Sequence, residues 1–396
     1  MKKKMTQFLH EMNSFTFKYP VKQYFGKGCL ETALNTEMPK MGNKVMLAYG
    51  GGSLKRSGLY DRIRKMLEAA GKRVVDFSGI MPNPTYAKVQ EGAKIARENN
   101  VDFILAVGGG SVIDCCKIVS IQAKTDDDIW SMQYGKERRM ATDCIPMGAI
   151  VTASGTGAEQ NNGAVITNEE LKLKQPLFGA FNSFAVLDSD LTMTLPMKQV
   201  ISGAFDTLSH CMETYMGRPA HTNLTDEINE AIMSNVIKNI RALIADPDND
   251  FARGELMWAS AMAENSILKL GKITDFQCHM LEYAVGAYTD CNHGAGLAII
   301  HPTLYRHMLD EGAEKLATMA ENVWGITEGS EKEKAAKGVD ALESFIREIG
   351  MPSRWCEIGV TDENQLRKAA DSTVLTPGCA KRFTHDELFE ILKETM

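Results

Sequence analysis

The segment from residue 203 to 213, GAFDTLSHCME, places an aspartate and a histidine four residues apart, at Asp206 and His210. If the segment is helical, both side chains lie on one face, one turn apart. Apolar residues at helical spacing in the same segment favour a helix. Such a carboxylate and imidazole supply half of a four-ligand metal site. Oxygen and nitrogen donors suit iron, zinc, manganese or nickel better than copper(I) or an iron–sulfur cluster.

An Asp–His pair at this spacing is common on helices and usually forms a hydrogen bond without any metal. Two further histidines make a metal site a better interpretation here than a simple hydrogen-bonded pair. His279 ends the sequence TDFQCH, and His293 lies in CNHGAG. The chain has only eight histidines, so two that follow an Asp-x-x-x-His segment support the hypothesis of a metal site.

The totals describe an ordinary soluble, globular protein. The chain has 396 residues, of which 44% are hydrophobic and 24% charged, which suggests two or three domains. Its net charge of −7 makes nucleic acid or an anionic membrane an improbable general partner. The chain contains no run of 18 apolar residues, so we expect no membrane-spanning helix. Nine scattered cysteines without a C-x-x-C motif are typical of reduced thiols, so we expect a cytoplasmic protein.

Residues 1–190 alternate between strand-like and helix-like segments, a pattern that predicts βαβ units and a parallel sheet. We expect strands at 15–19, 44–49, 73–77, 103–107, 145–152, 164–167 and 184–187. From about residue 191 long helical patterns dominate, and we expect helices at 199–216, 225–245, 251–270, 274–288, 312–323 and 331–349. The sequence therefore predicts an α/β domain over 1–190 and an all-helical domain over 191–396.

Two glycine clusters follow predicted strands, where parallel sheets bind their ligands. In the second cluster, Gly108, Gly109, Gly110 and Ser111 open a helix. Glycines there let an anion approach the backbone, and the helix start offers free N–H groups. The cluster is not G-x-G-x-x-G, so a pyrophosphate cradle and a plain turn remain about equally good interpretations.

The first cluster, Gly50 to Ser53, is followed by Lys55 and Arg56 and contains no acid. An acid would favour NAD, whereas hydroxyl and basic groups suit the 2′-phosphate of NADP. The two basic residues could equally be solvated surface charges. A third polar stretch, TASGTGAE from Thr152, ends another predicted strand and on its own is weak evidence for a site.

Taken together, the chain resembles the iron-containing (group III) alcohol dehydrogenases, and most closely their butanol dehydrogenase-like branch. The resemblance covers nearly the whole length. It rests on FGKG from Phe25, PNP around Asn83, GGGSVIDCCK from Gly108, TGAE from Thr156, the Leu187-Asp188 and Leu195-Pro196 pairs, and the order and spacing of the metal motifs.

The resemblance implies an N-terminal dinucleotide-binding domain and a C-terminal metal-binding and substrate domain. It implies a divalent metal, Fe²⁺ or else Zn²⁺, Ni²⁺ or Mn²⁺, held by Asp206, His210, His279 and His293. It also implies a nicotinamide site lined by Gly109, Gly110, Ser111, Thr152, Thr156, Lys174 and Leu191, to which we add Gly51, Gly52, Ser53 and Asn83. Asp114 matches an acid near the nicotinamide, so a catalytic role is possible. Members of the family usually assemble from dimers, so we expect a homodimer.

One position departs from the family pattern. The family commonly carries His-x-x-x-His where this chain has HMLEY, so that Tyr283 replaces the second histidine. A tyrosine hydroxyl can pass a proton, but its ordinary pKa of about 10 is poorly matched to neutral pH. Proton delivery could come from Tyr283, a metal-bound water or the ribose of the cofactor, and we name Tyr283 as a candidate catalytic residue.

These observations favour an NADP(H)-preferring, metal-dependent alcohol dehydrogenase or aldehyde reductase acting on small primary alcohols or aldehydes, such as butanol. One alternative is a lyase of the dehydroquinate synthase type, which would bind the same cofactor and a metal. The other is a catalytically impaired nucleotide-binding homologue, suggested only by Tyr283.

Overall fold

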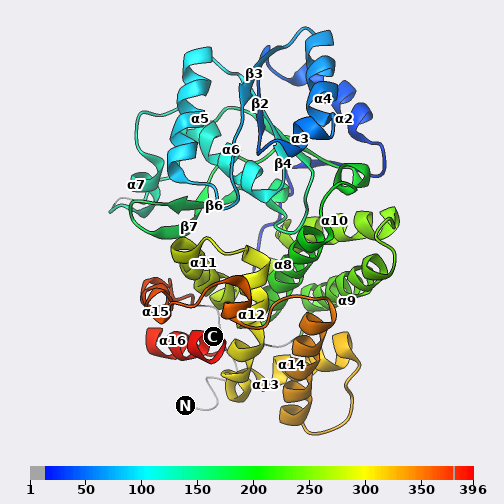
Figure 1. Cartoon of the computed structure of the whole chain (residues 1–396), viewed down its shortest axis with the longest axis vertical. Helices are drawn as coiled ribbons and strands as arrows, with labels where there is room; N and C mark the ends of the chain where they lie inside the picture. The colour runs from blue at the N-terminus through cyan, green and yellow to red at the C-terminus, as the bar shows by residue number, and fades with distance from the viewer. Residues whose placement is uncertain (1–13, 137, 221, 378–379) are drawn as a thin grey trace. The chain divides into compact units, whose positions relative to one another are not determined.

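The computed structural model describes residues 14–136, 138–220, 222–377 and 380–396. These residues form two compact units (Figure 1), which we call the sheet unit and the helical unit. The sheet unit comprises Tyr19–Val200 and Asp248–Ala261, and the helical unit consists chiefly of Ile201–Pro247 and Met262–Met396. The domain boundary expected at residue 190 stays a prediction.

The sheet unit is built on six parallel strands in the order β1-β8-β5-β4-β2-β3. The strands are β1 (Lys22–Phe25), β2 (Lys44–Tyr49), β3 (Arg73–Phe77), β4 (Phe103–Gly108), β5 (Met147–Val151) and β8 (Phe184–Leu187). A separate antiparallel hairpin consists of β6 (Gly163–Asn168) and β7 (Leu173–Phe178).

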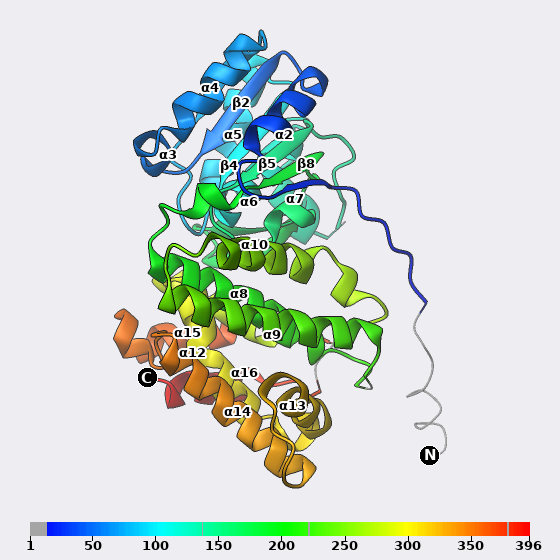
Figure 2. The same ribbon diagram turned by 90° about the vertical axis from the view of Figure 1, so that its right-hand side faces the viewer.

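Both faces of the parallel sheet are buried, which explains why its strands read as nearly continuous apolar runs. Along β2, Met46 and Ala48 pack on one face, whereas Val45 and Leu47 pack on the other. The first face carries the helices α5 (Tyr86–Asn99) and α6 (Gly110–Gln122), together with α7 (Ile129–Tyr134); the second carries α2 (Leu30–Glu37) and α4 (Leu59–Ala69). Figures 1 and 2 show these helices on the two sides of the sheet.

The order of the strands reverses beside β2. The chain runs from β2 outward to β3 and then returns to place β4 on the other side of β2. In open parallel sheets a ligand crevice forms at such a reversal, beyond the carboxyl ends of the two strands. The two glycine clusters follow these two strands, and α3 (Ser53–Arg56) begins directly after the first.

The helical unit contains most of α8 (Met197–Tyr215), the end of α10 (Asp250–Glu264), and a series of further helices. These are α9 (Leu224–Ala245), α11 (Gln277–Thr289), α12 (His293–Arg306), α13 (Leu309–Trp324), α14 (Glu331–Glu348), α15 (Glu363–Ser372) and α16 (His385–Glu394). The buried α12 contacts α11, α13, α14 and α16 (Figure 1), so its first residue, His293, is anchored by a packed helix.

The fold class predicted from the sequence is confirmed, but several of its elements need correction. The strand expected at 15–19 is wrong, because those residues are irregular and the edge strand is β1 at Lys22–Phe25. The helix expected over 251–270 ends at Glu264. The sequence reading also missed the strand β7 and the helices α2, α7, α12 and α15. No described helix is both long and apolar enough to cross a membrane.

Candidate metal centre and cofactor site

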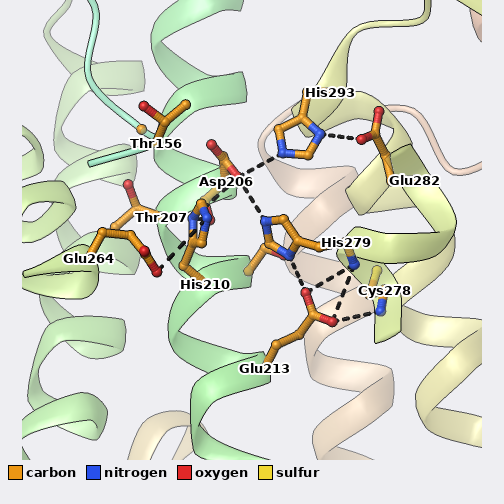
Figure 3. Close-up of polar contacts among 12 residues, drawn as sticks. Thr156, Asp206, Thr207, His210, Glu213, Glu264, Cys278, His279, Glu282 and His293 are labelled. Carbon is orange, nitrogen blue, oxygen red and sulfur yellow. Dashed lines mark hydrogen bonds and ion pairs between the residues drawn. The ribbon is translucent and has the colours of Figure 1, made fainter. Parts of the chain in front are cut away.

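Asp206 lies on α8, whereas His279 lies on α11 and His293 at the start of α12 (Figure 3). The structure brings one ligand atom of each residue within 4.8 Å of the others. Asp206 Oδ1 is 3.4 Å from His279 Nε2 and 3.3 Å from His293 Nε2. Metal–ligand bonds of about 2.0–2.2 Å place the donors of a tetrahedral site about 3.4 Å apart. The spacing of these three atoms therefore fits a single bound cation.

Two of these atoms are left without a hydrogen bond. Asp206 Oδ1 and His279 Nε2 are buried, and neither has a hydrogen-bond partner among the described residues. Buried polar atoms are almost always satisfied, since an unsatisfied one costs about 1–3 kcal/mol. Two such atoms that face each other at 3.4 Å are accounted for if a cation binds both.

The rear nitrogen of each of two imidazoles is held by a glutamate. His279 Nδ1 bonds to Glu213, and His293 Nδ1 bonds to Glu282. A carboxylate accepts and cannot donate, so each Nδ1 carries the proton and each Nε2 is free to bind a metal. Carboxylate–histidine–metal arrangements of this kind orient ligands and raise their basicity.

Glu213 and Glu282 are functional candidates that sequence reasoning missed. Each lies three residues after a candidate ligand, Glu213 after His210 and Glu282 after His279, which was the available signal. Glu213 nevertheless orients His279, on another helix. It also accepts hydrogen bonds from the backbone N–H groups of Cys278 at 2.6 Å and His279 at 3.2 Å.

The carboxylates give the centre a strong preference for positive charge. Burial alone would lower the pKa of His279, but the charges of Glu213 and Asp206 outweigh it and raise the pKa to about 10. Burial likewise opposes ionisation of Asp206, yet His210 and His293 hold its pKa well below the ordinary value. A divalent cation would satisfy the same electrostatic demand.

His210 lies beside this group of three and is not part of it. Its Nδ1 is 3.4 Å from Asp206 Oδ1 and donates to the Asp206 carbonyl oxygen at 2.9 Å, closing one turn of α8. Its ring centroid is 4.4 Å from that of His279. The i, i+4 geometry expected for the pair is therefore present. The ligand role of His210 stays a prediction.

Tyr283 lies against the imidazoles, as a residue one turn after His279 should. Its ring stacks on His293 with centroids 5.5 Å apart, and it meets the edge of His279 at 5.8 Å. Tyr283 is buried. The candidate proton donor thus lies at the metal centre, although its catalytic role stays a prediction.

A second group of donor atoms, from Glu213, Cys278 and His301, lies in the same unit. Glu213 already accepts three N–H groups from Cys278 and His279. Burial and the charge of Glu213 raise the pKa of the Cys278 thiol well above its ordinary value, which disfavours the thiolate that a metal needs. We therefore interpret this group as support for His279.

In the sheet unit, most predicted cofactor residues follow the carboxyl ends of neighbouring strands. Gly51, Gly52 and Ser53 follow β2, Asn83 follows β3, and Gly109, Gly110 and Ser111 follow β4. Thr152 and Thr156 follow β5, and Leu191 follows β8. The structure thus places these residues along one edge of the sheet.

The loop around Thr156 packs against the start of α6 and is held by α10. A Cβ added to Gly110 would lie 2.3 Å from Thr156 Oγ1, so only glycine lets the two loops meet. Ser260 Oγ of α10 accepts hydrogen bonds from Gly155 and Gly157 at 3.0 and 3.1 Å, which fixes the loop around Thr156. Sequence reasoning missed Ser260, since it follows this loop by a hundred residues.

Lys174 and Asp114 do not directly follow a strand of the parallel sheet, since Lys174 lies on β7 and Asp114 on α6. Lys174 is buried on β7, where it pairs in register with Thr167. Thr167 in turn donates its backbone N–H to Pro84, next to Asn83. Asp114 on α6 accepts a hydrogen bond from the Val165 backbone at 2.9 Å. Asp114 is thus held against β6, and its catalytic role stays a prediction.

Comparison with known proteins identifies the family. Residues 20–189 match the model for iron-containing alcohol dehydrogenase, and residues 200–396 match its C-terminal domain. The chain belongs to the iron-containing alcohol dehydrogenase family. It is therefore an oxidoreductase that acts on alcohols with a nicotinamide cofactor.

Relatives cover nearly the full length. The chain is 37% identical to a probable NADH-dependent butanol dehydrogenase of Bacillus subtilis, over 97% of this chain and 100% of the relative. It is 36% identical to the NADPH-dependent aldehyde reductase YqhD of Escherichia coli, over 88% and 90%. The crystal structure of NADH-dependent butanol dehydrogenase A from Thermotoga maritima superposes with a TM-score of 0.91 at 31% identity, over 98% and 99%. These relatives do not favour the lyase alternative.

Removing either glutamate that orients an imidazole should weaken metal binding. Glu213→Gln and Glu282→Gln keep the shape but remove the charge that fixes the imidazole tautomer. Each should lower metal affinity about 10–100-fold, the usual effect of such partners. Chelator competition on the purified protein measures this affinity. Glu348→Gln, at an exposed glutamate paired with Arg241, is the matched control, and equal affinity in all three variants would contradict the assignment.

Proposed function

We propose that the chain catalyses reversible hydride transfer between NADP(H) and a small primary alcohol or aldehyde at a divalent metal, with Fe²⁺ the first candidate. The observation that carries this proposal is the convergence of Asp206 Oδ1 and two glutamate-backed imidazole nitrogens at tetrahedral spacing. Butanol dehydrogenases and an aldehyde reductase among the relatives support small, largely apolar substrates.

Asp206, His279 and His293 would hold the cation, and His210 would complete the donor set. One carboxylate and three imidazoles suit iron(II), zinc, nickel or manganese. A bound cation supplies Lewis acidity toward the substrate oxygen, and the nicotinamide supplies or accepts the hydride. The protein's part is to orient these groups and to deliver the proton.

Replacing the cation's donors should abolish metal content and turnover together. Asp206→Ala and His279→Ala each remove one donor from the compact group. The measurement is the initial rate of NADPH or NADH oxidation with a panel of short-chain aldehydes, together with elemental analysis of each variant. Full activity in a metal-free variant would refute the proposal. Net consumption of the cofactor separates this proposal from the lyase alternative. A lyase would convert its substrate without any net change in nicotinamide absorbance.

We propose that Tyr283 delivers the proton. Its ring stacks on His293 and meets the edge of His279, and the family's usual histidine is absent at this position. A positioned acid or base contributes about 10²–10⁴-fold to a rate. During reduction, the tyrosine hydroxyl would donate its proton to the substrate oxygen as the aldehyde becomes the alcohol.

Tyr283→Phe removes only the hydroxyl. It should lower kcat for aldehyde reduction about 100-fold or more at neutral pH, without changing metal content. Tyr288→Phe, on the same helix α11, provides the control. An unchanged kcat for Tyr283→Phe would assign proton delivery to another group.

The preference for NADP(H) rests on the basic residues after β2. Lys55 Nζ lies over the rings of Tyr49 and Tyr60, and the Arg56 guanidinium folds back over Gly52. One nearby acid escaped the sequence reading, Asp76 on β3. Its carboxylate already accepts from the Tyr60 hydroxyl and the Arg64 guanidinium, each at 2.9 Å. The 2′-phosphate of NADP would meet two basic side chains here. The ribose hydroxyl of NAD would meet a carboxylate that already accepts two hydrogen bonds, so this region suits NADP better.

The double variant Lys55→Ala/Arg56→Ala should raise the KM for NADPH more than the KM for NADH. Charge-assisted hydrogen bonds contribute about 1.5–3 kcal/mol, so the ratio of the two KM values should shift by about tenfold or more. Initial rates at fixed aldehyde measure both constants. Arg62→Ala, at an exposed arginine paired with Glu31, is the control. An equal change for both cofactors would contradict the preference.

We also infer a cytoplasmic homodimer. The described cysteines are free thiols, which agrees with a reducing compartment. The strand β1 lies at the edge of the sheet with Phe25 exposed, and exposed edges are sites of pairing. The mass from sedimentation, compared with 43.7 kDa for one chain, decides the oligomeric state.

A further inference from the structure

A third glutamate, at the end of α10, faces His210. Glu264 is buried, and its Oε1 lies 4.0 Å from His210 Nε2 (Figure 3). Its other oxygen, Oε2, accepts a hydrogen bond from Lys269 Nζ at 2.8 Å. Glu264 belongs to none of the sequence motifs described above.

The tautomer of His210 determines what lies between these two atoms. His210 Nδ1 is 2.9 Å from the Asp206 carbonyl oxygen, which can only accept, so Nδ1 carries the proton. Nε2 then carries a lone pair and faces a carboxylate oxygen. Two electron-rich atoms turned toward each other in a buried site are stabilised by a cation between them. Two metal–ligand bonds of about 2.0–2.2 Å can span up to about 4.4 Å, which includes the observed separation.

We propose that Glu264 is a further metal-binding residue, which donates Oε1 to the cation held by His210 Nε2. This inference rests on the proposed metal site and adds one donor to it. Asp206 and Glu264 would then supply two negative charges to balance a dication. A second carboxylate also makes the donor set harder, which favours iron(II) or manganese(II) over softer ions.

Lys269 provides the counter-charge to Glu264 when the cation is absent. Its side chain is about one-third exposed, at 31%, so solvent is available to its ammonium. The ammonium also lies 5.0 Å from the centre of the Phe276 ring, which borders His210 and His279. Lys269 thus competes with a metal for the same carboxylate. Removing the carboxylate should weaken metal binding, whereas removing the ammonium should not.

The test is Co²⁺ binding to protein freed of metal by chelation, for the unsubstituted chain, Glu264→Gln and Lys269→Met. Affinity is measured by competition with a chromophoric chelator, and coordination by visible d–d absorption. Glu264→Gln should weaken binding about 10-fold or more and change the absorption, because a donor is lost. Lys269→Met should bind Co²⁺ as tightly as the unsubstituted chain or more tightly, because a competing positive charge is lost.

Glu264→Asp keeps the charge but shortens the reach, and its affinity should fall between those of the unsubstituted chain and Glu264→Gln. Circular dichroism of each metal-free variant establishes that it is folded. Equal weakening in Glu264→Gln and Lys269→Met would overturn the inference, since it would make Glu264 only the partner of Lys269. Unchanged affinity and absorption in Glu264→Gln would overturn it as well. Absence of Co²⁺ binding by the unsubstituted chain would overturn the proposed function itself.

Discussion

The candidate metal centre depends on the contacts of the Asp206 carboxylate with three imidazoles. One oxygen of this buried group faces nitrogens of His210, His279 and His293 at 3.3–3.4 Å. Each imidazole has a glutamate near its other nitrogen. Burying this much charge is costly unless each group is paired. The packing of α8, α11 and α12 therefore has to place each imidazole beside a carboxylate.

Each helix positions its candidate ligand in a different way. On α8, a spacing of four residues places Asp206 and His210 on one face. His293 is the first residue of α12, and Asn292 caps that helix through its side chain. His279 lies near the start of α11, where Glu213 accepts two backbone N–H groups and the imidazole N–H. The same carboxylate therefore caps the start of α11 and orients the His279 imidazole.

Local sequence patterns were sufficient for the features that depend on neighbours in the chain. The strands β2 and β3 are predicted with their observed bounds, because a short apolar run and the turn residues that follow define each of them. The edge strand was misplaced, because Phe15 to Tyr19 is as strand-like as β1 and only pairing with the distant β8 selects Lys22–Phe25. The pairs Glu213–His279 and Ser260–Gly155 likewise join residues far apart in sequence, so no local pattern could reveal them.

All the candidate metal donors, and the glutamates behind them, belong to the helical unit. The residues that line the edge of the parallel sheet belong to the other unit. The two chemistries are thus encoded in separable stretches of polypeptide. An engineer could therefore exchange the proposed cofactor-binding stretch for that of a relative and leave every candidate donor to the cation in place.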